Sequence, residues 1–283
     1  MINAKLEKIR QDELNYEKTL LSIAEKICES NEIKLVLIAG GSCAGKTTTT
    51  RKLSELITAS GRRALTISLD DYYRNLDESV YLPDGTRDIE SINSLRVDLI
   101  RQTFELLLAG KEAPIPMFDF KTTYRTDDYR RIKASENDVV LVEGLHALDT
   151  SLFATLPSDN AIFKIYLYAS SPDGIDCRFV RRLVRDSRHR GASAEETYAL
   201  WDNVKRNEYV SIEPFFETAD VTINTFFPYE RSILNDDAIE RLKTVSADNV
   251  NYESAQELVK ILAPVEQWPD DYVPKNSLLR EFM

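Results

Sequence analysis

The stretch "IKLVLIAGGSCAGKTTTT", residues 33–50, joins a run of apolar residues to a glycine-rich loop and then to four threonines. The apolar part predicts a strand over 33–39, and the part from Lys46 to about residue 59 predicts a helix. Residues 40–47, "GGSCAGKT", fit the pattern G-x-x-x-x-G-K-[ST] and lie between strand and helix, as that pattern requires. The stretch therefore predicts a phosphate-binding loop at the end of a buried strand.

The glycines of this loop let backbone N–H groups turn inward around phosphate oxygens, where side chains would obstruct them. The start of the following helix adds a partial positive charge at the same place. The pattern predicts that Lys46 contacts the outer phosphates of a nucleoside triphosphate and that the Thr47 hydroxyl binds Mg²⁺. The alternative is a glycine-rich turn that only connects a strand to a helix.

The rest of the chain continues the alternation of strands and helices. Further strands are predicted over 64–69, 138–144, 161–169 and 219–224. Helices are predicted over 6–28, 92–109, 173–188, 194–216 and 252–262. Because strand, helix and strand follow one another in this order, we expect an α/β fold in which a parallel sheet has helices on both faces.

The composition limits the kinds of protein that this chain can be. Its 283 residues are 43% hydrophobic with a net charge of −11, which indicates a globular core and argues against nonspecific binding to nucleic acid or anionic membranes. No apolar run approaches the ~20 residues that span a bilayer, and the first residues lack the apolar segment of a signal peptide. Cys28, Cys43 and Cys177 lie far apart without metal-ligand spacing, so we expect a reduced, cytoplasmic protein.

Two acidic residues end the second strand in "TISLDDYYR", residues 66–74. Ligands of open α/β sheets bind beyond the carboxyl ends of the strands, which places Asp70 near the phosphate-binding loop. An aspartate there can accept a proton from an attacking hydroxyl or hold the water shell of the metal. The alternative is a pair of solvated turn residues.

A further carboxylate closes an apolar strand in "VVLVEGLHAL", residues 139–148. Glu143 takes the Walker B position, at the end of a buried strand, where it can bind Mg²⁺ directly or through water. We expect His146, close by, to have a structural role.

Six arginines against one acid, Asp186, crowd the stretch "RFVRRLVRDSRHRG", residues 178–191. On a helix, Arg178, Arg181, Arg182 and Arg185 would share a face, where like charges repel. An anionic partner such as a triphosphate would relieve that repulsion, and guanidinium groups stabilise a phosphoryl group in transfer. With Gly191 as a hinge, the stretch predicts a lid; an ordinary solvated basic helix is the alternative.

Taken together, these motifs resemble the uridine kinase and phosphoribulokinase group of P-loop kinases, and most closely its bacterial nucleoside-kinase branch. The similarity runs from about residue 33 to residue 224 through "GGSCAGKTT", "SLDDYY", "PIPMFDFKTTYR", "LVEGLHAL", "RRLVRDSRHRG" and "ADVTIN", in the order of the family, and "VPKNSLLREF" (273–282) resembles the end of that branch. The resemblance implies a three-layer, NMP-kinase-like fold with an arginine-rich lid, and transfer of phosphate from ATP to a 5′-hydroxyl near Asp70. The order of the predicted elements gives one domain with terminal appendages: an N-terminal helix over 1–30, a P-loop kinase domain over 31–227, and a C-terminal helical extension and tail over 228–283 packed on the kinase domain.

The chain departs from the family where the acceptor would be recognised. Uridine kinases typically have Tyr-Asp-Phe followed by a histidine, where this chain has Phe118-Asp119-Phe120 and then Thr123. Glu90 stands where the family has an aspartate that contacts ribose hydroxyls, and a glutamate keeps that acceptor. Without the phenol and the imidazole, hydrogen-bond partners for a pyrimidine are missing, so the base stays open.

The predicted site can be stated residue by residue. The predicted catalytic residues are Asp70, Lys46, Arg182 and Arg185. The predicted nucleotide-binding residues are Gly40, Gly41, Ser42, Cys43, Ala44, Gly45, Lys46, Thr47, Thr48 and Arg181. The predicted acceptor-binding residues are Asp70, Tyr73, Glu90, Phe118, Thr123 and Arg178. The predicted metal ligands are Thr47 and Glu143.

The cofactors implied are Mg²⁺ and ATP as phosphate donor, and the partner is a small-molecule acceptor rather than nucleic acid or membrane; a homo-oligomer stays open. The leading hypothesis is a nucleoside kinase for a uridine- or cytidine-like acceptor. The first alternative is a phosphoribulokinase-like kinase of a sugar phosphate or vitamin precursor, in which Arg125, Arg130 and Arg131 would bind a second phosphate. The second is a nucleotide-dependent binding protein without kinase activity, although the chain has no N-K-x-D motif.

Overall fold

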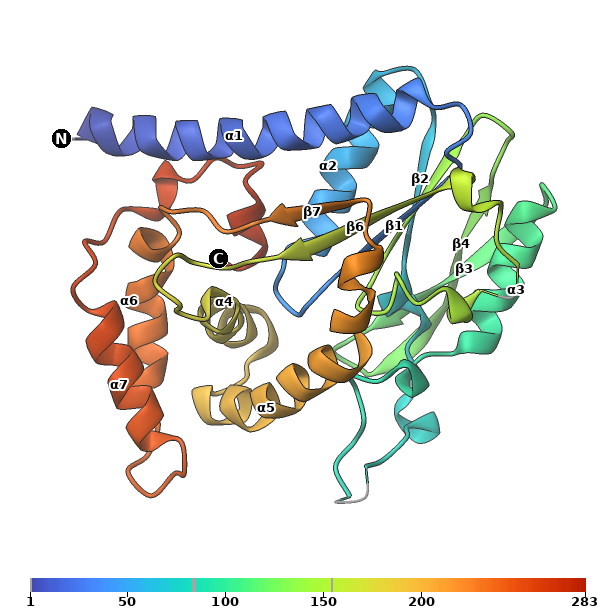
Figure 1. Cartoon of the computed structure of the whole chain (residues 1–283). Helices are drawn as coiled ribbons and strands as arrows, with labels where there is room; N and C mark the ends of the chain where they lie inside the picture. Colours follow the sequence, from blue (N-terminus) through green and yellow to red (C-terminus); the bar gives the residue numbers. More distant parts are fainter. Residues whose placement is uncertain (1, 83–84, 154) are drawn as a thin grey trace.

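A computed structural model describes residues 2–82, 85–153 and 155–283. Among these residues, the central sheet has five strands in the order β2-β5-β1-β6-β7 (Figure 1). Each neighbouring pair is parallel. The strands are β1 (Leu35–Gly40), β2 (Ala64–Ser68), β5 (Val139–Glu143), β6 (Ile162–Tyr168) and β7 (Val221–Asn224). The predicted parallel sheet is confirmed, with each strand within two residues of its expected bounds.

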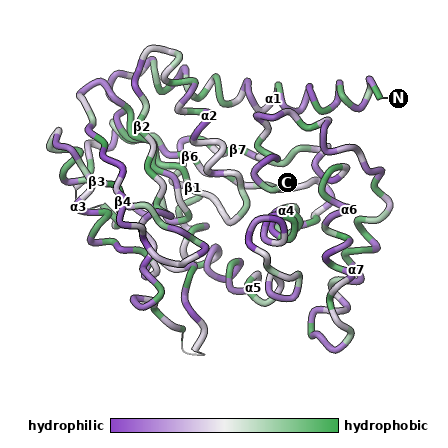
Figure 2. The backbone as a smooth tube through the Cα atoms, turned by 180° about the vertical axis from the view of Figure 1, so that it is seen from behind, coloured by the Kyte–Doolittle hydropathy of each residue, from purple (hydrophilic) through white to green (hydrophobic). Residues whose placement is uncertain are grey.

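The sheet separates two hydrophobic cores, because side chains of a strand alternate between its faces. In β1, Val36 and Ile38 enter one core, while Leu35, Leu37 and Ala39 enter the other. The first core contains residues of α1 (Ile2–Glu29), α2 (Lys46–Ala59), α4 (Cys177–Arg185), α5 (Ala194–Ser211), α6 (Arg231–Leu242) and α7 (Tyr252–Leu262). The second contains residues of α3 (Val97–Leu108), β3 (Glu112–Asp119) and β4 (Tyr124–Lys133). The expected three-layer architecture is confirmed, and Figure 2 shows the central strands as mainly hydrophobic between helices of mixed character.

Helix α1 begins earlier than expected and packs across α2 (Figure 1). Its buried residues, among them Ile9, Leu20 and Ile27, join the first core, and the Tyr16 hydroxyl forms a 2.7 Å hydrogen bond with Thr49 of α2. The helix therefore packs on the element that carries the glycine-rich loop. Among the described residues, no helix is both long and apolar enough to cross a membrane.

The hairpin of β3 and β4 was not expected. Two prolines interrupt the first strand, and the second is mostly exposed and charged, so neither shows the alternation that predicts a strand. Pairing between the two strands and packing against α3 hold this hairpin in place, and these are tertiary contacts.

Three predicted helices are shorter than expected, for local reasons. The helix expected over 92–109 starts at Val97, because the Ser91 side chain accepts from the Asn93 N–H and forms a separate 3₁₀ turn. The helix expected over 194–216 ends at Ser211, ahead of a 3₁₀ turn that contains a proline. The helix expected over 173–188 is α4, which is capped by Asp176 and followed by a π-helical turn, Asp186–Arg190. The predicted helix Tyr252–Leu262 is confirmed as α7.

Candidate active site

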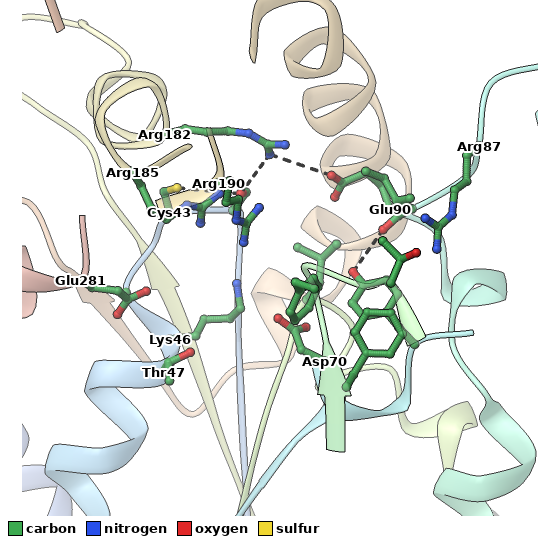
Figure 3. Close-up of a pocket in the computed structure, with 18 residues that line it drawn as sticks. Cys43, Lys46, Thr47, Asp70, Arg87, Glu90, Arg182, Arg185, Arg190 and Glu281 are labelled. Carbon is green, nitrogen blue, oxygen red and sulfur yellow. Dashed lines mark hydrogen bonds and ion pairs between the residues drawn. The ribbon is translucent and has the colours of Figure 1, made fainter. Parts of the chain in front are cut away.

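A cavity of about 440 Å³ lies beyond the carboxyl ends of β1 and β2 (Figure 3). The residues that line it are Ser42, Cys43, Gly45, Lys46, Thr47, Asp70, Tyr73, Arg87, Ile89, Glu90, Phe118, Phe120, Thr123, Leu145, Arg182, Arg185, Arg190 and Glu281. They come from segments far apart in the sequence. Twelve of these eighteen residues belong to the predicted site.

The glycine-rich loop forms one wall of the cavity, between the end of β1 and the start of α2. The Lys46 ammonium donates a 3.1 Å hydrogen bond to the Gly41 carbonyl, which holds the lysine across the loop. Figure 3 shows Lys46 and Thr47 on one side of the cavity and Asp70 facing them. Gly40, Gly41, Ala44 and Thr48 belong to the same loop and helix start but do not line the cavity.

Glu143 lies behind the loop and fits a magnesium site. Its Oε1 accepts a 2.6 Å hydrogen bond from Ser68 and lies 3.4 Å from the Thr47 hydroxyl. Its Oε2 is buried and has no hydrogen-bond partner among the described residues. Burial, and then the charge of Asp70, raise the pKa of Glu143 to about 7. Mg²⁺ is usually bound by one or two protein oxygens plus phosphates, and a buried orphan carboxylate oxygen beside a threonine hydroxyl meets that need.

Asp70 enters the cavity directly after β2. Its backbone N–H donates to the Ser68 hydroxyl, so the strand end and the 3₁₀ turn Leu69–Tyr72 orient the residue. Its carboxylate forms no hydrogen bond or ion pair with the described residues. The carboxylate is therefore free to accept a hydrogen bond from a ligand hydroxyl.

Three arginines converge on the cavity from α4 and the turn after it, and they share one carboxylate. Asp186 accepts from Arg182 at 3.1 Å and from Arg185 at 2.7 Å, and it lies 3.6 Å from Arg190. Burial, and then the charge of Arg185, lower the pKa of Arg190. Even with Glu90, whose carboxylate lies 3.9 Å from Arg182, the nearby acids are fewer than the three guanidinium groups, so this lid segment has unmet positive charge for an anion such as a phosphate.

Arg178 and Arg181, two of the four arginines expected to share one helix face, do not line the cavity, which corrects their predicted roles. Arg178, expected to bind the acceptor, donates two hydrogen bonds to the Glu208 carboxylate, at 2.7 and 2.8 Å. This pair lies behind the loop, so close to Gly41 that an added Cβ there would overlap the side chains of Arg178 and Glu208. Arg181, expected to bind nucleotide, is fully buried and is paired with Glu230. The physical reason is that each of these two guanidinium groups has its own buried carboxylate.

We expect Arg181→Met to lower the free energy of unfolding by about 3–5 kcal/mol, because it leaves Glu230 buried without its partner. The double variant with Glu230→Gln should regain part of that loss. Denaturant unfolding of each variant measures the effect. The matched control is Arg51→Met, in an exposed pair with Glu55, which should cost less than about 1 kcal/mol. Equal losses for Arg181→Met and the control would contradict the structural role of Arg181.

Three aromatic rings form the opposite wall. The ring of Tyr73 lies 5.7 Å from those of Phe118 and Phe120, which are 5.1 Å apart. Thr123 follows in the tight turn of the hairpin with a positive φ of 60°. This wall offers flat apolar surfaces next to the carboxylate of Asp70.

Glu90 lies at the same end of the cavity. Its backbone carbonyl oxygen is hydrogen-bonded to the His146 ring at 2.8 Å and to the Asn207 amide at 2.7 Å. The turn after β5 and helix α5 therefore hold the backbone at Glu90 in place. Its carboxylate is 3.9 Å from Arg182. Burial raises the pKa of Glu90 to about 7, against the opposing charge of Arg182.

Sequence reasoning missed several residues of this cavity. Arg190 belongs to the arginine-rich stretch 178–191, and Phe120 belongs to the Phe-Asp-Phe stretch. Predicted site residues in the same two stretches were a signal for both. Arg87 is three residues before Glu90 and belongs to no sequence motif that predicts a binding site. Glu281 lies more than 230 residues from the glycine-rich loop, and only the fold brings it there.

A phosphate-binding loop, a free carboxylate opposite it and a lid of arginines define the class of P-loop phosphotransferases. The family model "Phosphoribulokinase / Uridine kinase family" matches residues 35–228, and the chain belongs to this family. The family implies a kinase with a hydroxyl acceptor and ATP as phosphate donor.

A uridine kinase, a plant pyrophosphatase and one solved structure are among the proteins similar to this chain. The chain is 30% identical to a uridine kinase of Macrococcus caseolyticus over 192 residues, which are 67% of this chain and 86% of that protein. It is 28% identical over 246 residues to "Inorganic pyrophosphatase TTM2" of Arabidopsis thaliana, covering 85% of this chain and 34% of that protein. The chain thus spans about a third of the plant relative's length. The solved structure of the YGR205w protein shares the fold, with a TM-score of 0.50 at 14% identity over 69% of this chain and 86% of that one.

Proposed function

We propose that this protein transfers the terminal phosphate of ATP to the 5′-hydroxyl of a uridine- or cytidine-like nucleoside. The observation that carries the proposal is the pairing of Asp70 with the aromatic wall in one cavity. A nucleoside places its 5′-hydroxyl at one end and a flat base at the other. Asp70 would meet the hydroxyl while Phe118 and Phe120 contact the base.

The proposed roles follow from positions in the cavity. The loop amides and Lys46 bind the donor phosphates, and Arg182 and Arg185 contact the phosphoryl group as its charge redistributes. Asp70 orients the acceptor hydroxyl and takes its proton, and the Glu90 carboxylate accepts hydrogen bonds from the sugar hydroxyls. When bound by Thr47 and Glu143, Mg²⁺ would neutralise phosphate charge.

An acceptor screen tests the proposal. Purified protein is incubated with MgATP and, separately, with ribonucleosides, deoxyribonucleosides, sugar phosphates and vitamin precursors that carry a free hydroxyl. We expect ADP formation to depend on a pyrimidine nucleoside and to yield its 5′-monophosphate by mass spectrometry. Turnover with only a non-nucleoside acceptor would overturn the nucleoside assignment and leave the kinase assignment in place.

A second candidate is a kinase of a phosphorylated acceptor. The arginines expected to bind a second phosphate are engaged elsewhere: Arg125 pairs with Glu78, Arg131 lies 3.2 Å from Glu112, and Arg130 donates to a backbone carbonyl. Arg87 favours this candidate instead, since it lines the cavity and its guanidinium forms no hydrogen bond or ion pair with the described residues. The sugar phosphates of the same screen separate the two candidates.

The charge of Glu90 predicts a pH dependence of acceptor use. The charges that face it are Arg182 and Lys46, which lower its pKa, and Glu208 and Asp70, which raise it. With a pKa of about 7 the carboxylate is protonated at lower pH, where it loses its negative charge and one of its two oxygens becomes a hydrogen-bond donor. We expect kcat/KM for the acceptor to fall about tenfold from about pH 8 to about pH 6.

Steady-state kinetics of wild type and Glu90→Gln measure this effect. The variant should have a lower acceptor kcat/KM that varies little over this pH range, while its KM for ATP stays near the wild-type value. Folding stability changes with pH in the opposite direction to activity. Because the Glu90 pKa is raised in the folded protein, this group stabilises the fold fully at pH values below its ordinary pKa, and the stabilisation is lost as the pH rises through about 7. An unchanged pH profile in the variant would remove Glu90 from the acceptor site.

A further inference from the structure

The segment 273–283 returns to the glycine-rich loop and covers it. Leu278, Leu279 and Phe282 are fully buried. Gly45, with a φ of 79°, lies so close to Leu278 that an added Cβ would come within 2.5 Å of its side chain. The segment is therefore packed against the loop as part of the core.

Three further contacts hold this segment in place. The Phe282 ring lies 4.9 Å from the Arg181 guanidinium, and the Met283 carbonyl is 2.8 Å from the His189 ring nitrogen in the turn after α4. A hydrogen bond of 3.1 Å joins Ser277 to the buried Tyr229 hydroxyl. Since these contacts lie on both sides of Glu281, its backbone is fixed while its side chain reaches the cavity.

The Glu281 carboxylate caps the start of α2. Its Oε2 accepts from the Thr48 hydroxyl at 2.7 Å and from the Thr48 backbone N–H at 3.3 Å. That N–H is one of the first four of the helix, which have no partner within the helix. Figure 3 shows Glu281 on the same side of the cavity as Lys46 and Thr47.

A bound triphosphate needs the same donors. The N–H groups of a glycine-rich loop and of the helix that follows it cradle phosphate oxygens. A carboxylate and a phosphate at one helix start repel each other and compete for one set of hydrogen-bond donors. The carboxylate of Glu281 and a donor phosphate therefore exclude each other from Thr48.

We propose that Glu281 is a built-in competitor of the donor phosphates, whose carboxylate occupies the start of α2 in the empty enzyme and rotates away when nucleotide binds. Because the segment around it is anchored, the side chain moves while the backbone stays. The apparent affinity for nucleotide is then reduced by the fraction of molecules in which the carboxylate occupies Thr48. This inference concerns the donor side and does not depend on which acceptor the enzyme uses.

Isothermal titration calorimetry of the full chain tests the proposal with two probes, MgADP and inorganic tripolyphosphate. In Glu281→Gln, which keeps the shape and removes the charge, and in Glu281→Ala, which removes the cap, we expect the Kd of both probes to fall about three- to tenfold. Tripolyphosphate has no base or sugar, so a change shared by both probes locates the effect at the phosphates.

The matched control is Glu253→Gln in the exposed first turn of α7, which makes the same change in net charge and should leave both Kd values unchanged. Thermal unfolding verifies that each variant is folded. If Glu281→Ala does not fold, the Kd values of Glu281→Gln alone test the proposal. An unchanged or higher Kd in Glu281→Gln, or an equal fall in the control, would overturn the proposal. If the wild-type protein turned over none of the nucleosides while Glu281→Gln bound both probes more tightly, the proposed acceptor would be wrong and the competition at Thr48 would stand.

Discussion

Asp70→Asn is expected to lower kcat by about 10²–10⁴-fold, while the Kd for MgATP changes by less than about threefold. The carboxylate faces the cavity without a partner among the described residues, so its replacement removes a proton acceptor and disturbs no internal bond. Phosphoryl transfer depends mainly on positioning, and an amide still occupies the space but presents an N–H₂ group where the hydroxyl must donate. Single-turnover kinetics with saturating ATP and acceptor measure the chemical step directly.

The neighbouring aspartate provides a matched control. Asp71 does not line the cavity, and its carboxylate accepts from the Phe118 N–H at 3.4 Å. Asp71→Asn makes the same change in charge one residue away, and we expect less than about a tenfold loss of kcat. If both variants turned over at the wild-type rate, Asp70 would have no part in the chemical step.

Lys46→Met is expected to lower kcat/KM for ATP by about 10²–10³-fold and to weaken nucleotide binding as well. The lysine is half-buried, and the only hydrogen bond of its ammonium group to a described residue is the one to the Gly41 carbonyl, so the ammonium can turn to the phosphates. Methionine keeps the apolar stem and removes the charge that faces the donor. Kinetics with varied ATP, together with titration of MgADP, separate the loss of binding from the loss of rate.

A lysine far from the cavity completes this test. Lys260 is exposed in the last turn of α7, and Lys260→Met should leave kcat/KM and the Kd for MgADP within about twofold of wild type. Wild-type kinetics in Lys46→Met would mean that the loop does not bind the donor through this ammonium.

The loop, the strands and their order could be predicted because their causes are local. Apolar runs of strand length, a glycine pattern and a helix start lie within a few consecutive residues, and parallel connections restrict how they are arranged. The positions of Asp70 and Glu143 in the site follow for the same reason, since the carboxyl ends of parallel strands meet at one edge of a sheet.

The roles of the arginines could not be predicted from spacing alone. Arg178, Arg181, Arg182 and Arg185 are equivalent as a sequence pattern, yet two distant carboxylates, Glu208 and Glu230, pair with the first two and turn them away from the cavity. Which guanidinium is neutralised and which faces the cavity depends on where those acids lie after folding.

What the sequence by itself determined was a phosphate-binding loop on a parallel sheet, with acids at the strand ends and an arginine-rich segment after them, because each of these arises from neighbouring residues. Only the tertiary structure decided that the hairpin builds an aromatic wall and that Glu281 reaches Thr48. The wall needs the hairpin rings beside Tyr73, and the cap needs Glu281 beside Thr48; both are contacts between segments tens to hundreds of residues apart, where burial and pairing outweigh any local preference.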